Sequence, residues 1–356
     1  MTLFETEKIN YTNVRILHIG AESQYRGGQK QSLFLHEGLL QHKLESYLLV
    51  NKTGLLYKET QRRETNHCYG FDTNVLNDLS AQVTTLQPDL IHYHDSKSIA
   101  YSRHFKNYLQ LATRRVSYPI KLSSRLGKYR HINAHVGVSQ EITTYLQQHF
   151  KNCHTIHSGM DLTELANPKK IPSFDPKCQH ILFVGALDQQ KGIEILFNAF
   201  NRISKDNVHL HIVGSGKLEK ILHNITQKLS LSHKIHFYGQ QTNVSDFYHS
   251  ASVVVVPSVK GEGSSGVIKE AMAMSKVVIA SNLKGNLELF EDEKTGIAFE
   301  NKDEFDLSQK IEAVLQGNYS QLVPLEIKKA AANFTKEKMT RNYIKLYQEL
   351  MENMGL

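Results

Sequence analysis

Two glutamates eight residues apart, Glu262 and Glu270, flank a run of small residues in the second half of the chain. The run reads Gly-Ser-Ser-Gly at residues 263–266, and helix-forming residues follow it. We expect Ser264 or Ser265 to be the N-cap of that helix, so that the neighbouring amides point at an anion. One carboxylate would then lie in the loop and the other about two turns inside the helix. A glutamate-rich surface turn is the alternative interpretation.

A lysine beside a glycine turn is the second feature with chemistry. An apolar run from His180 to Val184 ends at Gly185, and Lys191 and Gly192 follow where the next helix should start. A compact ammonium suits a phosphate, and glycine lets the backbone approach a ligand closely. A solvent-facing lysine is the simpler reading in isolation. Its occurrence together with the loop between the glutamates favours a phosphorylated ligand.

Two polar clusters in the first half also follow apolar runs. Arg26, Gly27 and Gly28 precede a helical stretch, where a glycine pair permits close approach of a phosphate or a sugar. An ordinary strand-to-helix turn is the alternative there. His92 and His94 alternate at the end of another run, without a third and fourth ligand at a recognisable spacing. We therefore expect no metal ion at these histidines.

Short β-branched runs alternate with longer amphipathic stretches along the chain, and these elements must position the residues above. Such alternation predicts an α/β protein with parallel sheets covered by helices. We predict strands at 14–19, 46–50, 89–93, 114–117, 134–138, 180–184, 208–213, 234–238, 252–256 and 277–280, and helices at 29–40, 75–86 and 140–150.

A stretch rich in proline and lysine at 161–177 predicts a linker between two doubly wound, Rossmann-like units. We place the units at residues 1–165 and 166–335, facing each other across a cleft, because ligands bind beyond the carboxyl ends of such sheets. The remaining segment, 336–356, predicts an amphipathic helix at 336–354, a candidate to pack across the boundary.

Composition limits the class of protein. The 356 residues are 40% hydrophobic and 22% charged, enough for two domain cores, and no stretch reaches the roughly 20 apolar residues of a membrane span. The three scattered cysteines and the polar first ten residues predict a reduced, cytoplasmic protein. The net charge of +7 indicates an anionic partner, and no nucleic-acid recognition module accompanies it. A mildly basic enzyme without a special partner is the alternative.

Taken together, these motifs resemble the large family of retaining glycosyltransferases with the GT-B fold, usually called family 4 or glycosyl transferases group 1. The resemblance covers essentially the whole second unit. It is carried by the Gly-x-Leu-x3-Lys-Gly pattern at 185–192, the Val-Pro-Ser turn at 256–258, the Glu-x7-Glu motif at 262–270 and the Lys-Gly-Asn-Leu-Glu run at 284–288.

The resemblance implies a site for a nucleotide diphosphate sugar. Glu262 and Lys191 would be the catalytic residues, Lys191 at the diphosphate and Glu262 at a hydroxyl of the transferred sugar, while Glu270 would hold the ribose. The donor-binding set that it implies is Gly27, Gly28, Gly185, Lys191, Gly263, Ser264, Ser265, Gly266, Glu270 and Glu288. On the acceptor or sugar side we place Arg26, His94 and Arg115.

The chain also departs from the family pattern. The family often has an arginine just after the glycine where this chain has Ala186, so one phosphate contact is missing or supplied elsewhere. The usual Phe-Gly inside the glutamate motif is replaced by Ser264 and Ser265. A family histidine that follows the strand after His94 has no counterpart, and Arg115 or Lys121 stands in its region.

The expected function is retaining, metal-independent transfer of a hexose-like unit to a hydroxyl of a glycan or glycolipid acceptor. Lipopolysaccharide or surface-polysaccharide assembly is the expected setting, with no cofactor and no nucleic acid. The expected location is cytoplasmic, with peripheral contact at the inner face of an anionic membrane as an extension. A nucleotide-sugar epimerase on the same fold and a catalytically inactive sugar-nucleotide-binding protein are the alternatives.

Overall fold

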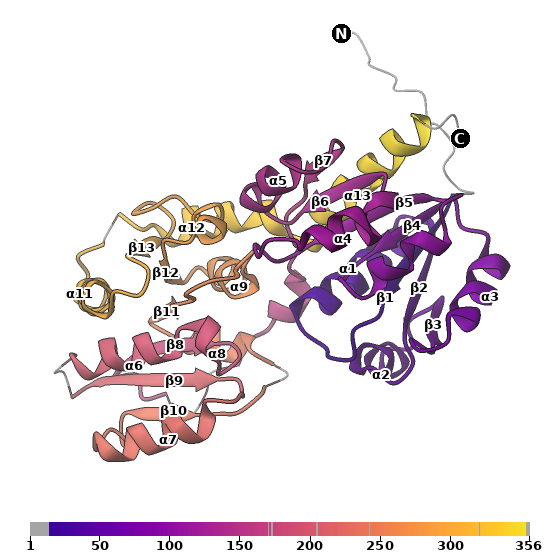
Figure 1. Cartoon of the computed structure of the whole chain (residues 1–356). Helices are drawn as coiled ribbons and strands as arrows, with labels where there is room; N and C mark the ends of the chain where they lie inside the picture. The colour runs from indigo at the N-terminus through magenta and orange to yellow at the C-terminus, as the bar shows by residue number, and fades with distance from the viewer. Residues whose placement is uncertain are drawn as a thin grey trace, which may run out of the picture.

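The computed structural model describes residues 14–353 except 170, 172–173, 204–205, 242 and 320. The chain forms two lobes, each built on one parallel sheet with helices packed against it (Figure 1). This confirms the predicted α/β class with two doubly wound units. The polar first ten residues and the last residue of the helix predicted at 336–354 lie outside the described residues.

The first lobe contains a seven-stranded sheet in the order β3-β2-β1-β4-β5-β6-β7, with every pair parallel. Both faces of this sheet are covered, because neighbouring residues on one strand, such as Ile16 and Leu17, enter different hydrophobic clusters. The strands are β1 Arg15–Gly20, β2 Glu45–Asn51, β3 Cys68–Phe71, β4 Leu90–Tyr93, β5 Leu109–Arg114, β6 Ala134–Gly137 and β7 Cys153–Thr155, and the helices are α1 Gly27–Gln41, α2 Leu55–Arg62, α3 Leu76–Leu86, α4 Leu122–Leu126 and α5 Gln140–Gln147.

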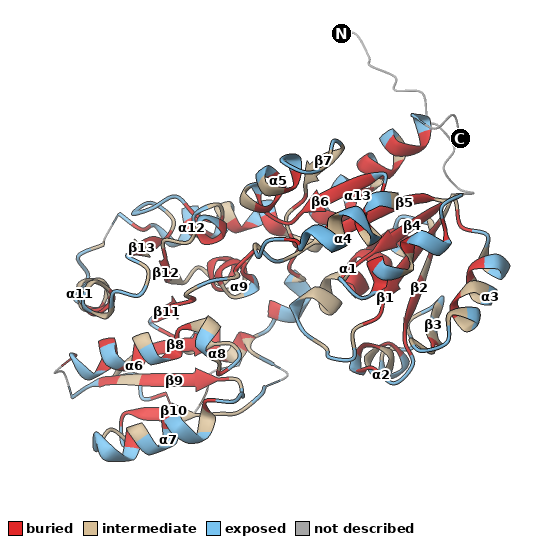
Figure 2. Cartoon of the chain, in the orientation of Figure 1, coloured by how far each residue is buried: buried red, intermediate tan, exposed pale blue. Residues whose placement is uncertain are grey.

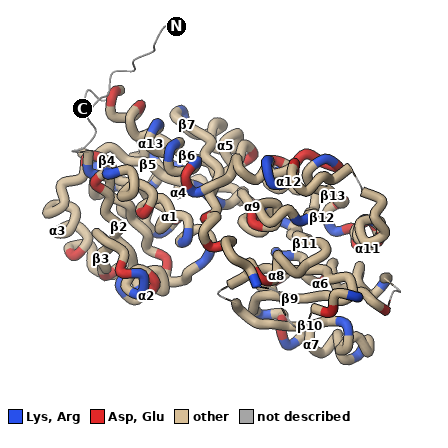
Figure 3. The backbone as a smooth tube through the Cα atoms, turned by 180° about the vertical axis from the view of Figure 1, so that it is seen from behind, with Lys and Arg blue, Asp and Glu red and all other residues tan. Residues whose placement is uncertain are grey.

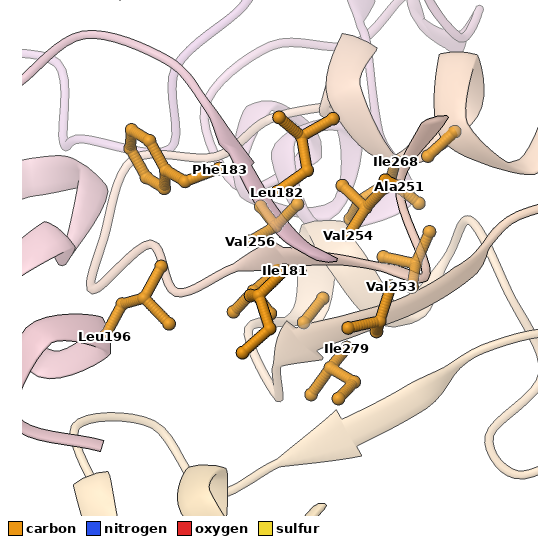
Figure 4. Packing of buried hydrophobic residues seen from close by; sticks show 14 of the residues in the cluster. Ile181, Leu182, Phe183, Leu196, Ala251, Val253, Val254, Val256, Ile268 and Ile279 are labelled. Carbon is orange, nitrogen blue, oxygen red and sulfur yellow. The ribbon is translucent and has the colours of Figure 1, made fainter. Parts of the chain in front are cut away.

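The second lobe contains a six-stranded parallel sheet in the order β10-β9-β8-β11-β12-β13. Its core is a dense set of aliphatic side chains from β8, β11 and β12 that pack with α6 and α9 (Figure 4). The strands are β8 Gln179–Val184, β9 Val208–Val213, β10 Ile235–Phe237, β11 Val253–Val256, β12 Val277–Ser281 and β13 Ile297–Phe299, and the helices are α6 Ile193–Asn201, α7 Glu219–Lys228, α8 Ser245–Ser250, α9 Gly266–Ala273, α10 Lys284–Leu287, α11 Glu304–Leu315 and α12 Pro324–Ala331.

The last helix, α13 (Lys336–Glu352), returns to the first lobe (Figure 1). Its apolar face, including Met339, Tyr343 and Leu346, is buried in the same cluster as Ile16 and Phe34. The chain after the second sheet therefore completes the core of the first lobe. The division into segments 1–165, 166–335 and 336–356 remains a proposal.

Burial follows the layers of each lobe. The central strands are buried along their length, whereas the outward faces of the helices are exposed (Figure 2). Among the described residues, none of the helices combines the length and the apolar character needed to cross a membrane.

The predicted strand at 114–117 is wrong. The strand in that region is β5, which ends at Arg114 and begins five residues earlier at Leu109. The polar residue Gln110 interrupts the apolar pattern by which β5 would have been predicted. Its side chain is nevertheless buried and donates a hydrogen bond to the Phe105 carbonyl at 2.9 Å. The sequence analysis also missed β3, β7 and β13. All three are edge strands of three or four residues, too short for a clear alternating pattern.

Candidate functional site

Strand order reverses once in each sheet, between β1 and β4 in the first lobe and between β8 and β11 in the second. Ligands of doubly wound sheets bind outside the carboxyl ends of the strands at such a point. The loops that leave these four strands carry most of the predicted site residues. In the second lobe, β8 leads to Lys191 and β11 leads to Glu262.

Lys191 and Glu262 form an ion pair between the Nζ and Oε1 atoms. Lys191 ends a short 3-10 helix, Gln189–Lys191, whose N-cap Asp188 accepts a hydrogen bond from the Lys191 amide at 3.1 Å. Glu262 is only 8% exposed, and its Oε1 atom also accepts a hydrogen bond from the Ser258 hydroxyl at 2.6 Å. The fold thus brings together the two motifs that the sequence analysis singled out separately.

Glycines allow these loops to pack backbone against backbone. Gly192 has φ +65°, and a Cβ atom there would lie 1.9 Å from the Pro257 carbonyl oxygen. A Cβ atom at Gly285 would lie 2.3 Å from the Glu262 carbonyl oxygen. A larger residue at Gly192 would separate the loop after β8 from the loop after β11, and a larger residue at Gly285 would separate the loop after β12 from the loop after β11.

The loop between the two glutamates leads into α9, with Ser265 at the N-cap position. The Ser265 side chain makes no capping hydrogen bond, and no acidic residue stands in the first turn. The Ser264 hydroxyl is instead 3.0 Å from the Nζ atom of Lys269. No side chain from this cap or first turn therefore competes with an anion for the first amides of α9.

Lys269 is a residue of this region that the sequence analysis missed. Its ammonium donates hydrogen bonds to the Ser264 hydroxyl and, across the boundary between the lobes, to the Ser158 carbonyl at 2.8 Å. The side chain is 1% exposed, and this burial lowers the pKa of Lys269 to about 7. A lysine within an otherwise apolar helix face was the available signal.

Glu270 follows Lys269 directly, just over one turn from the start of α9 rather than the expected two turns, and a residue of α8 (Ser245–Ser250) anchors it. The hydroxyl of Tyr248, a fully buried residue, donates a hydrogen bond to Glu270 Oε2 at 2.9 Å. Burial raises the pKa of Glu270, and the nearby positive charge of Lys30 on α1 partly opposes that shift. The other carboxylate oxygen, Oε1, lies 3.8 Å from where a Cβ atom at Gly266 would stand, beside the start of the helix.

On the first lobe, the predicted glycine pair begins α1. Arg26 is the N-cap, and its amide donates a hydrogen bond to the Gln29 side chain at 3.1 Å. Arg26 and Gly27 are exposed, whereas Gly28 faces the side chain of Arg115: a Cβ atom at Gly28 would lie 3.2 Å from Arg115 Cδ. The glycine pair and Arg115 therefore lie together, at the ends of β1 and β5.

Behind Arg115 lies a buried group of histidines. His94 shares a 2.8 Å hydrogen bond with His18 of β1, and His92 is hydrogen-bonded to the hydroxyls of Tyr347 and Thr113, each at 2.7 Å. One nitrogen of each of His18, His92 and His94 falls within 4.8 Å of the others, so His18 supplies the third imidazole that spacing did not indicate.

Electrostatics distinguish this group from an ordinary metal centre. Burial lowers the pKa of all three histidines, and the positive charge of Arg115 lowers it further. The Arg115 guanidinium contacts His94 at its carbonyl oxygen and at Nδ1, each at 3.2 Å. A second cation beside this guanidinium would meet repulsion. We interpret the group as neutral imidazoles that hold Arg115.

Glu288 belongs to a contact between the lobes. Its carboxylate accepts hydrogen bonds from the amides of Gln140 at 2.6 Å and Glu141 at 2.9 Å, at the N-terminus of α5. A carboxylate at this position completes the helix cap and favours the helix dipole. Its contact with the donor stays a prediction.

Lys and Arg positions are distributed over both lobes among the Asp and Glu positions rather than gathered on one face (Figure 3). The net charge of +7 therefore does not come from one cluster of basic positions along the backbone. At the predicted site the positive groups include Lys191 and the start of α9 in the second lobe, and Arg115 in the first.

Part of the chain is similar to a known protein family. Residues 167–338 match the family model described as glycosyl transferases group 1. An uncharacterized glycosyltransferase of Methanocaldococcus jannaschii is 32% identical over 219 residues, which are 60% of this chain and 59% of that protein. The N-acetylgalactosamine-N,N'-diacetylbacillosaminyl-diphospho-undecaprenol 4-alpha-N-acetylgalactosaminyltransferase of Campylobacter jejuni is 28% identical over 55% of this chain and 53% of that protein. The chain thus spans little more than half the length of these curated relatives.

Solved structures extend the similarity to nearly the whole chain. HepE from Anabaena, in a crystal structure of its complex with UDP-glucose, superposes with a TM-score of 0.81 and 18% identity. The superposition covers 94% of this chain and 99% of that one. At this level of identity the match shows the fold alone, and that fold is GT-B.

Proposed function

We propose that this GT-B protein is a retaining glycosyltransferase, because residues 167–338 match the family model described as glycosyl transferases group 1. It transfers a sugar from a nucleotide diphosphate sugar to a hydroxyl of a glycan or glycolipid acceptor. The observation that carries the proposal is the ion pair between Lys191 and Glu262 at the point where the second sheet reverses its strand order.

The proposed roles follow from that pair and its surroundings. Lys191 binds the diphosphate, together with the amides at the start of α9, and Glu262 accepts a hydrogen bond from a hydroxyl of the transferred sugar. Glu270, held by Tyr248, binds the ribose hydroxyls. Gly185, Gly263, Ser264, Ser265 and Gly266 let the phosphates approach the backbone, and Gly27 and Gly28 border the same ligand from the first lobe. In the absence of donor, Lys191 and Glu262 neutralise each other.

In the proposed reaction, the bond between the anomeric carbon and the diphosphate oxygen breaks while the acceptor oxygen bonds to the same carbon on the same face. The acceptor proton passes to a phosphate oxygen, so the products are a glycoside of retained configuration and a nucleoside diphosphate. Negative charge builds on the diphosphate in the transition state, where Lys191 and fixed amides stabilise it. This arrangement assigns to protein groups the task that a metal ion performs in metal-dependent transferases.

The substrate class rests on similar proteins. The Campylobacter relative bears the name of a transferase acting on a diphospho-undecaprenol acceptor, and the Anabaena structure contains UDP-glucose. We propose a uridine nucleotide sugar as the first donor to test and a lipid-linked or polysaccharide glycan as the acceptor. The cytoplasmic location, with peripheral contact at an anionic membrane, is part of the same proposal.

The test measures binding and then turnover. Thermal unfolding of the protein is followed with UDP, GDP, ADP and their sugars, each with a chelator present, because a ligand that binds the folded state raises Tm. The stabilising donor is then incubated with glycan and glycolipid acceptors, and the anomeric configuration of the product is read by NMR. We expect nucleoside diphosphate release that depends on the acceptor, retained configuration, and the same rate with chelator.

Other outcomes would identify the alternatives. Conversion of the donor to an isomer without acceptor would make the protein an epimerase. Tight donor binding without turnover on any acceptor would make it a binding protein. A protein that no nucleotide stabilises would refute the proposal.

A further inference from the structure

Arg115 is a cation in the site without a carboxylate partner among the described residues. Its guanidinium donates only to His94, at the carbonyl oxygen and Nδ1, and its Nε atom is buried with no hydrogen-bond partner. Burial lowers the pKa of Arg115, with the charge of Asp95 and the hydroxyls of Tyr343 and Tyr347 opposing the shift. A desolvated guanidinium with an unused donor is an unfavourable arrangement until an anion joins it.

The location of Arg115 specifies where that anion would sit. Its side chain packs against Gly28, since a Cβ atom there would lie 3.2 Å from Arg115 Cδ. Its backbone packs against the other lobe, since a Cβ atom at Gly263 would lie 2.5 Å from the Arg115 carbonyl oxygen. Arg115 therefore lies between the start of α1 and the loop that enters α9. Neither helix has an acidic residue in its first turn.

The second lobe lacks one cation that the resembled family often has. Residue 186, just after the glycine turn, is alanine, and Lys191 is the cation that remains in that loop. The loop after β8 thus offers a diphosphate one cation, Lys191. A guanidinium offers paired N–H groups that match two phosphate oxygens, which a lysine does not.

Resting on the proposed function, we propose that Arg115 binds the diphosphate of the donor from the first lobe and supplies the charge missing at residue 186. The donor then bridges the lobes, with Lys191 on one side and Arg115 on the other. This gives Arg115 a binding role at phosphate rather than at the sugar or the acceptor.

The buried histidines position this arginine. Because His94 Nδ1 faces an N–H donor, it must be the acceptor, so the proton lies on Nε2 and is donated to His18 Nδ1. The lowered pKa values of His18 and His94 keep both rings neutral, and a neutral ring is what leaves Nδ1 free to accept. Each terminal nitrogen of Arg115 contacts His94 through one N–H group, and the proposal assigns the second N–H group of each to the ligand.

The experiment compares diphosphate with monophosphate. Affinities for UDP, UMP and uridine are measured by calorimetry on the full chain, using Arg115→Gln, Arg115→Lys and the wild type. Arg114→Gln is the matched control, because the neighbouring guanidinium donates to the Tyr118 carbonyl and lies over the Tyr145 ring instead. Thermal unfolding of each variant verifies folding.

We expect Arg115→Gln to lower the affinity for UDP by about 10- to 100-fold, which is the range for one lost charge-assisted interaction. The affinity of Arg115→Lys should be intermediate. In Arg115→Gln, the affinity for UMP should fall by less than about 3-fold and the affinity for uridine should not change. Arg114→Gln should leave all three affinities unchanged.

Equal losses for UDP, UMP and uridine would overturn the inference by making Arg115 a purely structural residue. Unchanged UDP affinity in Arg115→Gln would overturn it too, while UDP binding by the wild type would leave the proposed function intact. A wild type that binds none of UDP, GDP and ADP would instead refute the proposed function itself, and the inference with it.

Discussion

The two lobes have the same strand order up to one extra edge strand, yet they distribute their charged groups differently. In the second lobe, the cation after β8 and the carboxylate after β11 neutralise each other within the lobe, as Lys191 and Glu262. In the first lobe, the hydrogen bonds that Arg115 makes among the described residues go to one neutral residue, His94.

This difference shows that the same sheet topology can hold charged groups in two different ways. A preformed ion pair holds two reactive groups in register before a ligand arrives, and a ligand must then compete with it. The guanidinium of Arg115 is desolvated and has no carboxylate partner among the described residues, so binding an anion would stabilise it. We therefore infer that the second lobe orients Lys191 and Glu262, whereas the first lobe attracts an anion through Arg115.

The largest expected effect is on the ion pair of the second lobe. Lys191→Ala should lower kcat/KM by about 10²- to 10³-fold, because a charge that stabilises the transition state is lost. Steady-state release of nucleoside diphosphate measures this. Lys228→Ala, at an exposed position on α7, is the control. A Lys191→Ala rate within 3-fold of wild type would contradict the assigned role.

The contact between the lobes at Lys269 should make stability depend on pH. The pKa of Lys269 is about 7 in the folded chain and near 10.5 when the lysine is free. Between these values the unfolded chain binds the extra proton, so stability rises with pH, and below pH 7 the burial penalty is fully present.

Removing the charge with Lys269→Met should abolish that slope. We expect the difference in the free energy of unfolding, wild type minus variant, to increase by on the order of a few kcal/mol between pH 7 and pH 10. Urea titrations at successive pH values measure it, with Lys228→Met as the exposed control. Parallel profiles for wild type and Lys269→Met would show that Lys269 is not protonated differently in the two states.

The close approach of the lobes depends on Gly263. Because a Cβ atom there would lie 2.5 Å from the Arg115 carbonyl, Gly263→Ala should push the loop away from the first lobe and weaken nucleoside diphosphate binding by about 10-fold. Gly20→Ala is the matched control, since its added methyl would meet nothing nearer than 3.7 Å. Equal affinities for the two alanine variants would show that the approach does not matter for binding.

The smallest effect concerns the helix cap across the lobes. Glu288→Ala removes the acceptor for the amides of Gln140 and Glu141 and should cost about 1 kcal/mol of stability. Chemical denaturation measures it against Glu291→Ala, which removes an exposed pair with Lys294. If both variants lose the same stability, the cap has no special contribution.

The sequence predicted the second lobe better than the first. The turn at Gly185, the lysine at 191 and the start of α9 each depend on residues within a few positions, so local chemistry sufficed. Edge strands such as β3 and β7 were missed because they are short, and β5 was shifted because a buried glutamine interrupts its apolar run.

By itself, the sequence determined the alternation of strands and helices, the glycine turns and the spacing of Glu262 and Glu270. These features are encoded in short windows by periodicity, capping and backbone freedom. Only the tertiary structure decided that Lys191 pairs with Glu262, that His18 meets His94, and that Arg115 lies between the two glycine loops. The physical reason is that these contacts join loops from strands far apart in the chain, and the order of strands in the folded sheets determines which loops become neighbours.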